Sequence, residues 1–132
     1  MVRPQLAITL WPWGSEVNLA ITYTNDSALI STTEYSLPGD GAGPTSQTTD
    51  GVFQFWIDFA NMAAGDQYRI RLYEKYDSGG TQRLVEEWIL TGAQSKPMFA
   101  LPSQILGEGW DVTVTKLAGT DRTIYWSIRK IA

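Results

Sequence analysis

The sequence contains no histidine and no cysteine among its 132 residues. These two absences exclude imidazole general bases, thiol nucleophiles, disulfides and the zinc sites that such side chains build. Charged residues make up only 18% of the chain, below the roughly 25% that is usual for soluble domains. A net charge of −4 is also a poor basis for wrapping nucleic acid. We therefore expect no cofactor, no metal and no direct contact with nucleic acid.

Long hydrophobic runs are missing as well. No apolar run approaches 18 residues, so the sequence predicts no transmembrane helix and no membrane partner. Pro12, Gly14 and Glu16 interrupt the N-terminal stretch, which therefore does not resemble a signal peptide. The absence of cysteine is compatible with synthesis in a reducing cytosol.

The chain is instead rich in small polar residues and glycine, with 14 Thr, 9 Ser and 12 Gly. This mixture favours strands and turns over helices. Alternation of apolar and polar residues is clearest in 67–76, which a turn at 77–80 connects to a partner strand at 83–91. A second hairpin spans 110–128, around a turn at 118–121.

Weaker patterns complete the expected set of strands. The segment Asn25-Asp26-Ser27 predicts a turn that joins strands at 17–24 and 28–37, and an apolar row spans 53–59. Residues 97–101 predict a short edge strand, and single helical turns are expected near 61–64 and 103–106. Together these segments predict an all-β fold, an antiparallel sandwich of jelly-roll or immunoglobulin-like type with seven to nine strands.

Two segments fall outside the alternating body. Residues 38–51 form a glycine-rich loop with almost no side chain to bury, and a loop of that length is usually functional or disordered. Residues 1–15 predict an N-terminal arm that precedes a sandwich domain at 16–132. Proline at position 12 suits such an arm better than a central strand.

The arm carries the candidate partner-contact residues of the chain. Its apolar side chains would form an exposed stripe in water, which favours docking on a neighbouring subunit, with strand addition to a sheet edge as the expected geometry. The alternative is that the arm folds back over its own sandwich. The candidates are Leu6, Ile8, Leu10, Trp11 and Trp13.

No combination of residues predicts catalysis. Glu86 and Glu87 are adjacent, and neighbouring strand residues point to opposite faces, so they cannot flank one substrate bond. A cross-strand pair of one of them with Arg71 is the natural interpretation. Asp40 and Asp50 bracket the glycine-rich loop, but they occur in ordinary turn dipeptides and are too few for a calcium site. We expect that the protein is not an enzyme.

Six tryptophans and six tyrosines are the feature that most favours a binding function. Exposed rows of such rings bind sugars or stack on bases. However, Trp56 adjoins the 53–59 row, and Trp110 and Trp126 lie in strong strand patterns, so we assign these three to the core. Trp88 stays unassigned.

Three segments resemble a recurrent class of small proteins from tailed bacteriophages: GVFQFWIDFANMAAGDQYRIRLYEK (51–75), TGAQSKP (91–97) and GWDVTVTKLAGTDRTIYWSIRK (109–130). The resemblance implies a virion protein. A small acidic sandwich without catalytic groups is typical of capsid decoration (cement) proteins that bridge coat subunits. The implied partners are the major capsid protein or other virion subunits, with a trimer or dimer of this chain on the particle. The alternatives are a tail, connector or fibre-associated virion protein, or a carbohydrate-binding module.

Overall fold

The computed structural model describes the backbone of residues 6–9 and 16–131 and the side chains of residues 20–131. These ranges contain eleven strands, and over them no helix is long and apolar enough to cross a bilayer. In chain order the strands are β1 (Leu6–Thr9), β2 (Glu16–Leu19), β3 (Ile21–Ile30), β4 (Tyr35–Ser36), β5 (Gly41–Ala42), β6 (Gly51–Asp58), β7 (Gln67–Glu74), β8 (Arg83–Thr91), β9 (Met98–Leu106), β10 (Asp111–Ala118) and β11 (Arg122–Ile131).

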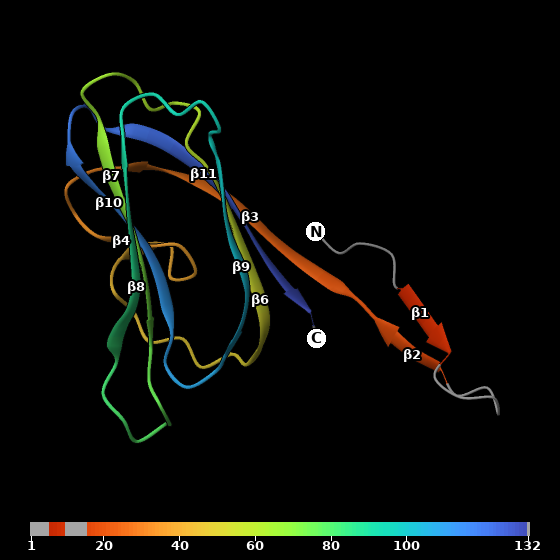
Figure 1. Cartoon of the computed structure of the whole chain (residues 1–132). Helices are drawn as coiled ribbons and strands as arrows, with labels where there is room; N and C mark the ends of the chain where they lie inside the picture. Colours follow the sequence, from red (N-terminus) through yellow and green to blue (C-terminus); the bar gives the residue numbers. More distant parts are fainter. Residues whose placement is uncertain (1–5, 10–15, 132) are drawn as a thin grey trace.

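Nine of the strands form two antiparallel sheets that pack face to face (Figure 1). One sheet has the order β5-β4-β10-β7-β8 and the other β3-β11-β6-β9. If the two-residue β5 is set aside and the other eight are renumbered along the chain, the orders become 2-7-4-5 and 1-8-3-6. This exchange of strands between the sheets is that of a jelly roll. The predicted antiparallel sandwich is confirmed.

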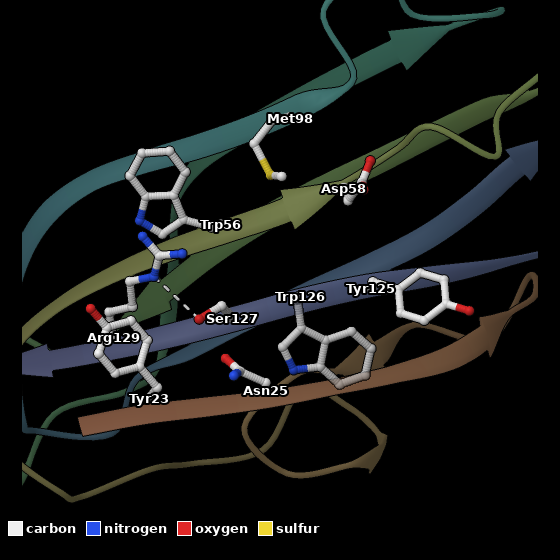
Figure 2. A pocket seen from close by; sticks show the side chains of 9 residues that line it. All are labelled: Tyr23, Asn25, Trp56, Asp58, Met98, Tyr125, Trp126, Ser127 and Arg129. Carbon is white, nitrogen blue, oxygen red and sulfur yellow. Dashed lines mark hydrogen bonds between the residues drawn. The ribbon is translucent and has the colours of Figure 1, made fainter. Parts of the chain in front are cut away.

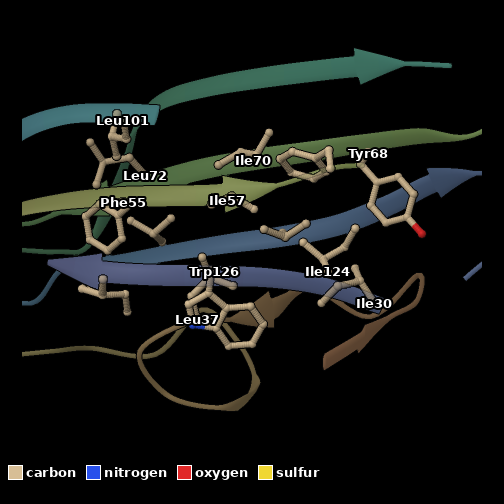
Figure 3. Close-up of a cluster of buried hydrophobic side chains, with 14 of the residues drawn as sticks. Ile30, Leu37, Phe55, Ile57, Tyr68, Ile70, Leu72, Leu101, Ile124 and Trp126 are labelled. Carbon is tan, nitrogen blue, oxygen red and sulfur yellow. The ribbon is translucent and has the colours of Figure 1, made fainter. Parts of the chain in front are cut away.

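The core lies between the two sheets and follows the alternation of the sequence (Figure 3). On β6 the inward residues are Phe53, Phe55 and Ile57, each at most 3% exposed. Trp110 and Trp126 are buried at 3% and 4%, which confirms their assignment to the core. Burying each of these large side chains contributes about 1.5–3 kcal/mol. The other contributors include Ile70, Leu72, Val112, Val114, Ile124 and Ile128.

The hairpin β7–β8 is present as predicted. Arg71 faces Glu87 across the pair, and its Nε lies 2.7 Å from Glu87 Oε1. A bulge between Leu72 and Tyr73 shifts the register near the turn. The pair lies on the solvent side of the sheet, where such a contact adds only a few tenths of a kcal/mol.

The predicted turn at Asn25-Asp26-Ser27 is wrong. Strand β3 runs through it without interruption, and it pairs residue by residue with β11 from Ile21 to Ile30. The local turn preference of Asn and Asp is weaker than a ten-residue ladder of backbone hydrogen bonds. The chain turns later, around residues 31–34.

Strand β9 also departs from the expectations. The predicted edge strand at 97–101 exists, but it begins at Met98 and extends to Leu106, so the helical turn expected near 103–106 is wrong. Strand β9 is the last in its sheet, and an edge strand tolerates Pro102 because one side of its backbone needs no donor.

The loop 38–51 is tied to the sandwich by the buried carboxylate of Asp111. Oδ1 accepts a hydrogen bond from Ser36 Oγ at 2.8 Å, and Oδ2 accepts one from the Thr45 backbone N at 2.6 Å. Burial raises the pKa of this carboxyl, against the opposing effect of its hydrogen bonds. Part of the loop forms β5, and Gln47 makes an isolated bridge to Trp110. The expectation of a loop with little to bury is therefore only partly met.

The N-terminal residues form their own two-stranded sheet, β1 with β2, which Figure 1 shows beyond the start of β3. Leu6 pairs with Leu19, and Ile8 pairs with Val17. The proposed boundary between residues 15 and 16 thus falls inside this hairpin. Leu10, Trp11 and Trp13 lie outside the described residues, and the intermolecular contact of the arm stays a prediction.

Candidate functional site

The outward side chains of three neighbouring strands share the open face of the β3-β11-β6-β9 sheet. Inward packing of Phe55 and Ile57 forces the residues between them outward, since the side-chain period of a strand is two. The register then aligns these outward residues in three rows: Tyr23–Arg129–Gln54, Asn25–Ser127–Trp56 and Ser27–Tyr125–Asp58. Residues distant in the sequence thereby meet on one surface.

A hollow of about 290 Å³ lies over these rows (Figure 2). Tyr125 and Met98, which are 54% and 51% exposed, are the most exposed large side chains around it. Its full lining is Tyr23, Asn25, Trp56, Asp58, Met98, Tyr125, Trp126, Ser127 and Arg129.

A second hollow of about 180 Å³ adjoins the first, and the two share Tyr23 and Arg129. The remaining lining of the second hollow is Ile21, Val52, Gln54 and Ile131. The two hollows lie side by side on the sheet face, and we refer to the surface that their lining residues form as the aromatic face.

Arg129 occupies the junction of the two hollows. Its guanidinium carbon lies 4.7 Å from the ring centroid of Trp56 and 5.3 Å from that of Tyr23. Nε donates a hydrogen bond to Ser127 Oγ at 3.3 Å. Contact with two ring faces restricts the side chain and leaves the edge of the guanidinium, which carries its N–H donors, as the part available to a ligand.

Polar groups orient the rest of the aromatic face. Trp56 Nε1 donates to Gln54 Oε1 at 3.3 Å, and Gln54 Nε2 donates to Ser103 Oγ at 3.0 Å. Asp58 Oδ1 accepts a hydrogen bond from the Ala60 backbone N at 2.9 Å. The chain holds the indole of Trp56 by its edge, with its ring against Arg129.

The assignment of Trp56 to the core is wrong. Trp56 is half-buried and lies on the opposite face from the inward row of β6. Its parity already indicates this, because it falls between Phe55 and Ile57. Trp88, unassigned from the sequence, is half-buried and packs edge-on against Phe99 with ring centroids 5.3 Å apart.

The carboxylates considered for catalysis or metal binding do not converge. Glu87 pairs with Arg71 on the other sheet, and the carboxylate of the aromatic face is a different one, that of Asp58. Asp40 accepts a hydrogen bond from the Tyr35 hydroxyl. Throughout the described part of the chain, no three acidic side chains gather as a metal site would require.

Sequence reasoning missed Tyr23, Asn25, Ser127 and Arg129. The predicted turn included Asn25 and ended the expected strand just after Tyr23, so the continuous strand that carries both residues was not recognised. On β11, Ser127 and Arg129 point outward because they alternate with the buried Trp126 and Ile128. Nothing local indicated that β3 and β6 flank β11, because these three strands are far apart in the chain.

No protein-family model matches the chain, and no curated protein matches it. Two solved structures of carbohydrate-binding modules are similar to it. One is a xylan-binding domain of family CBM22, with 18% identity and a TM-score of 0.35. The other is the C-terminal family 22 carbohydrate-binding module of Clostridium thermocellum Xyn10B, with 17% identity and a TM-score of 0.35. Each likeness covers 97% of this chain and 80% of the other. A likeness of this size carries no information about what this chain binds.

Proposed function

We propose that the protein is a carbohydrate-binding module and that the aromatic face is its binding surface. The observation that carries the proposal is the set of three aromatic side chains, Tyr23, Trp56 and Tyr125, around one open hollow that also contains Asn25 and Asp58. Exposed apolar side chains that are rimmed by polar groups are typical of ligand-binding surfaces.

The chemistry of a sugar matches this surface. The C–H faces of a pyranose ring are apolar and pack on aromatic rings, whereas its hydroxyls need donors and acceptors at the ring edge. Asn25 supplies both kinds of group and Asp58 supplies acceptors. The shallow shape of the surface suits a ligand that is held without being enclosed.

Replacing Trp56 with alanine is expected to weaken glycan binding by tenfold or more, because truncating an aromatic anchor typically costs about 2 kcal/mol. Tyr125→Ala is expected to act in the same direction. The measurement is a glycan array with the full chain, followed by calorimetry on the glycan that binds.

Tyr76→Ala is the matched control. Tyr76 is 89% exposed near the β7–β8 turn and is remote from the aromatic face in the chain's fold. Equal binding by all three variants and the unaltered chain, or no binding to any glycan, would refute the proposal.

A virion role is a second proposal. It is supported by the resemblance of residues 51–75, 91–97 and 109–130 to small proteins of tailed bacteriophages and by the separate hairpin of β1 and β2. We propose a capsid decoration protein, with a tail, connector or fibre-associated protein as the alternative. Mass spectrometry of purified particles distinguishes them: hundreds of copies indicate decoration, a few copies indicate a connector or tail part, and absence rejects both.

A further inference from the structure

Arg129 is the charged residue that lines both hollows of the aromatic face. Within residues 20–131, the ion pairs of the chain involve Arg69, Arg71, Lys116 and Arg122, and no carboxylate pairs with Arg129. Among the side chains that the structure describes, two rings and no acid lie against its guanidinium.

The two hollows differ in charge. Among the six residues that line the second hollow, Arg129 is the only charged one, and its neighbours are three aliphatic side chains, Gln54 and Tyr23. The first hollow contains Asp58, which lies two register rows from Arg129. The charge of the second hollow is therefore purely positive and lies where the two hollows meet, whereas the negative charge of Asp58 lies at the far side of the first hollow.

We infer that the aromatic face selects acidic saccharides, with the ligand's carboxylate bound by Arg129 over the second hollow. The inference rests on the proposed carbohydrate-binding function. A guanidinium presents a planar fork of N–H donors that matches a carboxylate, and charge-assisted hydrogen bonds are about twice as strong as neutral ones.

The placement of Asp58 sets the orientation of the ligand. A carboxylate near Asp58 is repelled, whereas a neutral ring there can donate its hydroxyl hydrogens to the Asp58 oxygens. The acidic sugar thus lies at the end toward Ile21 and Ile131, and a neutral neighbouring ring lies over Trp56 and Tyr125.

The test compares acidic saccharides with counterparts whose carboxylates have been reduced to alcohols. The four probes are oligogalacturonate and sialyllactose, each beside its carboxyl-reduced form, titrated calorimetrically into the full chain. For at least one pair we expect the acidic member to bind roughly tenfold more tightly, with a preference that shrinks as salt is raised. Arg129→Gln is expected to bring the ratio of the two affinities close to one.

Arg83→Gln is the matched control. It removes one positive charge from β8, on the other sheet, and is expected to leave the ratio unchanged. Neutral members that bind as tightly as acidic ones would overturn the inference and leave the proposed function in place. A preference that survives Arg129→Gln would also overturn it. Failure of all four probes to bind would overturn the inference, and failure of the glycan array as well would overturn the proposed function.

Discussion

Replacing Trp110 with alanine is expected to lower the free energy of unfolding by about 3–5 kcal/mol, the range for deleting a large buried aromatic side chain. Trp110 is 3% exposed, and its ring centroid lies 4.6 Å from that of Phe53 and 5.8 Å from that of Phe55. The cavity left behind would open at the end of the sandwich that loop 38–51 covers. Since domains are stable by about 5–15 kcal/mol, the variant should fold but be marginal.

The same substitution should also release loop 38–51. Trp110 Nε1 donates to the Thr49 carbonyl O at 2.9 Å, and the Trp110 backbone exchanges two hydrogen bonds with Gln47. Urea unfolding measures the stability, and hydrogen exchange at Thr45 and Gln47 measures the attachment of the loop. Loss of protection at these amides is the expected result.

Trp110→Phe separates packing from hydrogen bonding. It keeps an aromatic ring against Phe53 and Phe55 but loses the donor to Thr49, so a smaller loss of stability is expected than for alanine. Equal destabilisation of the two variants would mean that the ring packing of Trp110 does not stabilise the core. Full protection of the loop amides in Trp110→Ala would mean that Trp110 does not hold loop 38–51 to the sandwich.

The sequence predicts the fold correctly where local signals agree with tertiary packing. The hairpin expected at 110–128 is wrong, because β10 and β11 follow one another in the chain but pair in different sheets. On β7 and β8, alternation and a glycine-rich turn specify the same hairpin, and the structure contains it. On β3, a turn signal opposed a strand signal, and the long pairing with β11 decided the outcome. Local preferences of well under a few kcal/mol cannot outweigh such a ladder.

The candidate site was not predictable to the same degree. Parity alone places Trp56 outward once Phe55 and Ile57 are inward, so this residue was within reach of the sequence. Its convergence with Tyr23 and Arg129 was not, because it depends on β11 lying between β3 and β6. In a jelly roll, strands that are far apart in the sequence become neighbours in a sheet, and no short-range sequence pattern encodes which strands these are.

Asp66 joins two turns of the sandwich. Its carboxylate accepts hydrogen bonds from the Ala63 backbone N at 2.9 Å, the Thr120 backbone N at 3.0 Å and Arg122 Nε at 2.8 Å. Gly119, with φ of 87°, allows the 118–122 turn to approach this closely, because a Cβ there would collide with Asp66. Asp66 therefore links the β6–β7 connection to the β10–β11 turn.

Replacing Asp66 with asparagine is expected to lower the melting temperature at pH 7 by several degrees and to flatten its decline in acid. The Arg122 hydrogen bond, followed by those from Thr120 and Ala63, lowers the pKa of Asp66 from 3.8 to about 2. Because the folded pKa is depressed, this stabilisation is complete above about pH 5 and is lost progressively as the pH falls through the folded pKa of about 2. Asp111, whose pKa is raised, acts in the opposite direction and is unchanged in the variant.

Melting curves between pH 7 and 2 measure the difference, with the exposed Asp50→Asn as the control that should follow the unaltered chain. An acid decline as steep in Asp66→Asn as in the control would mean that the ionised Asp66 does not hold the two turns together.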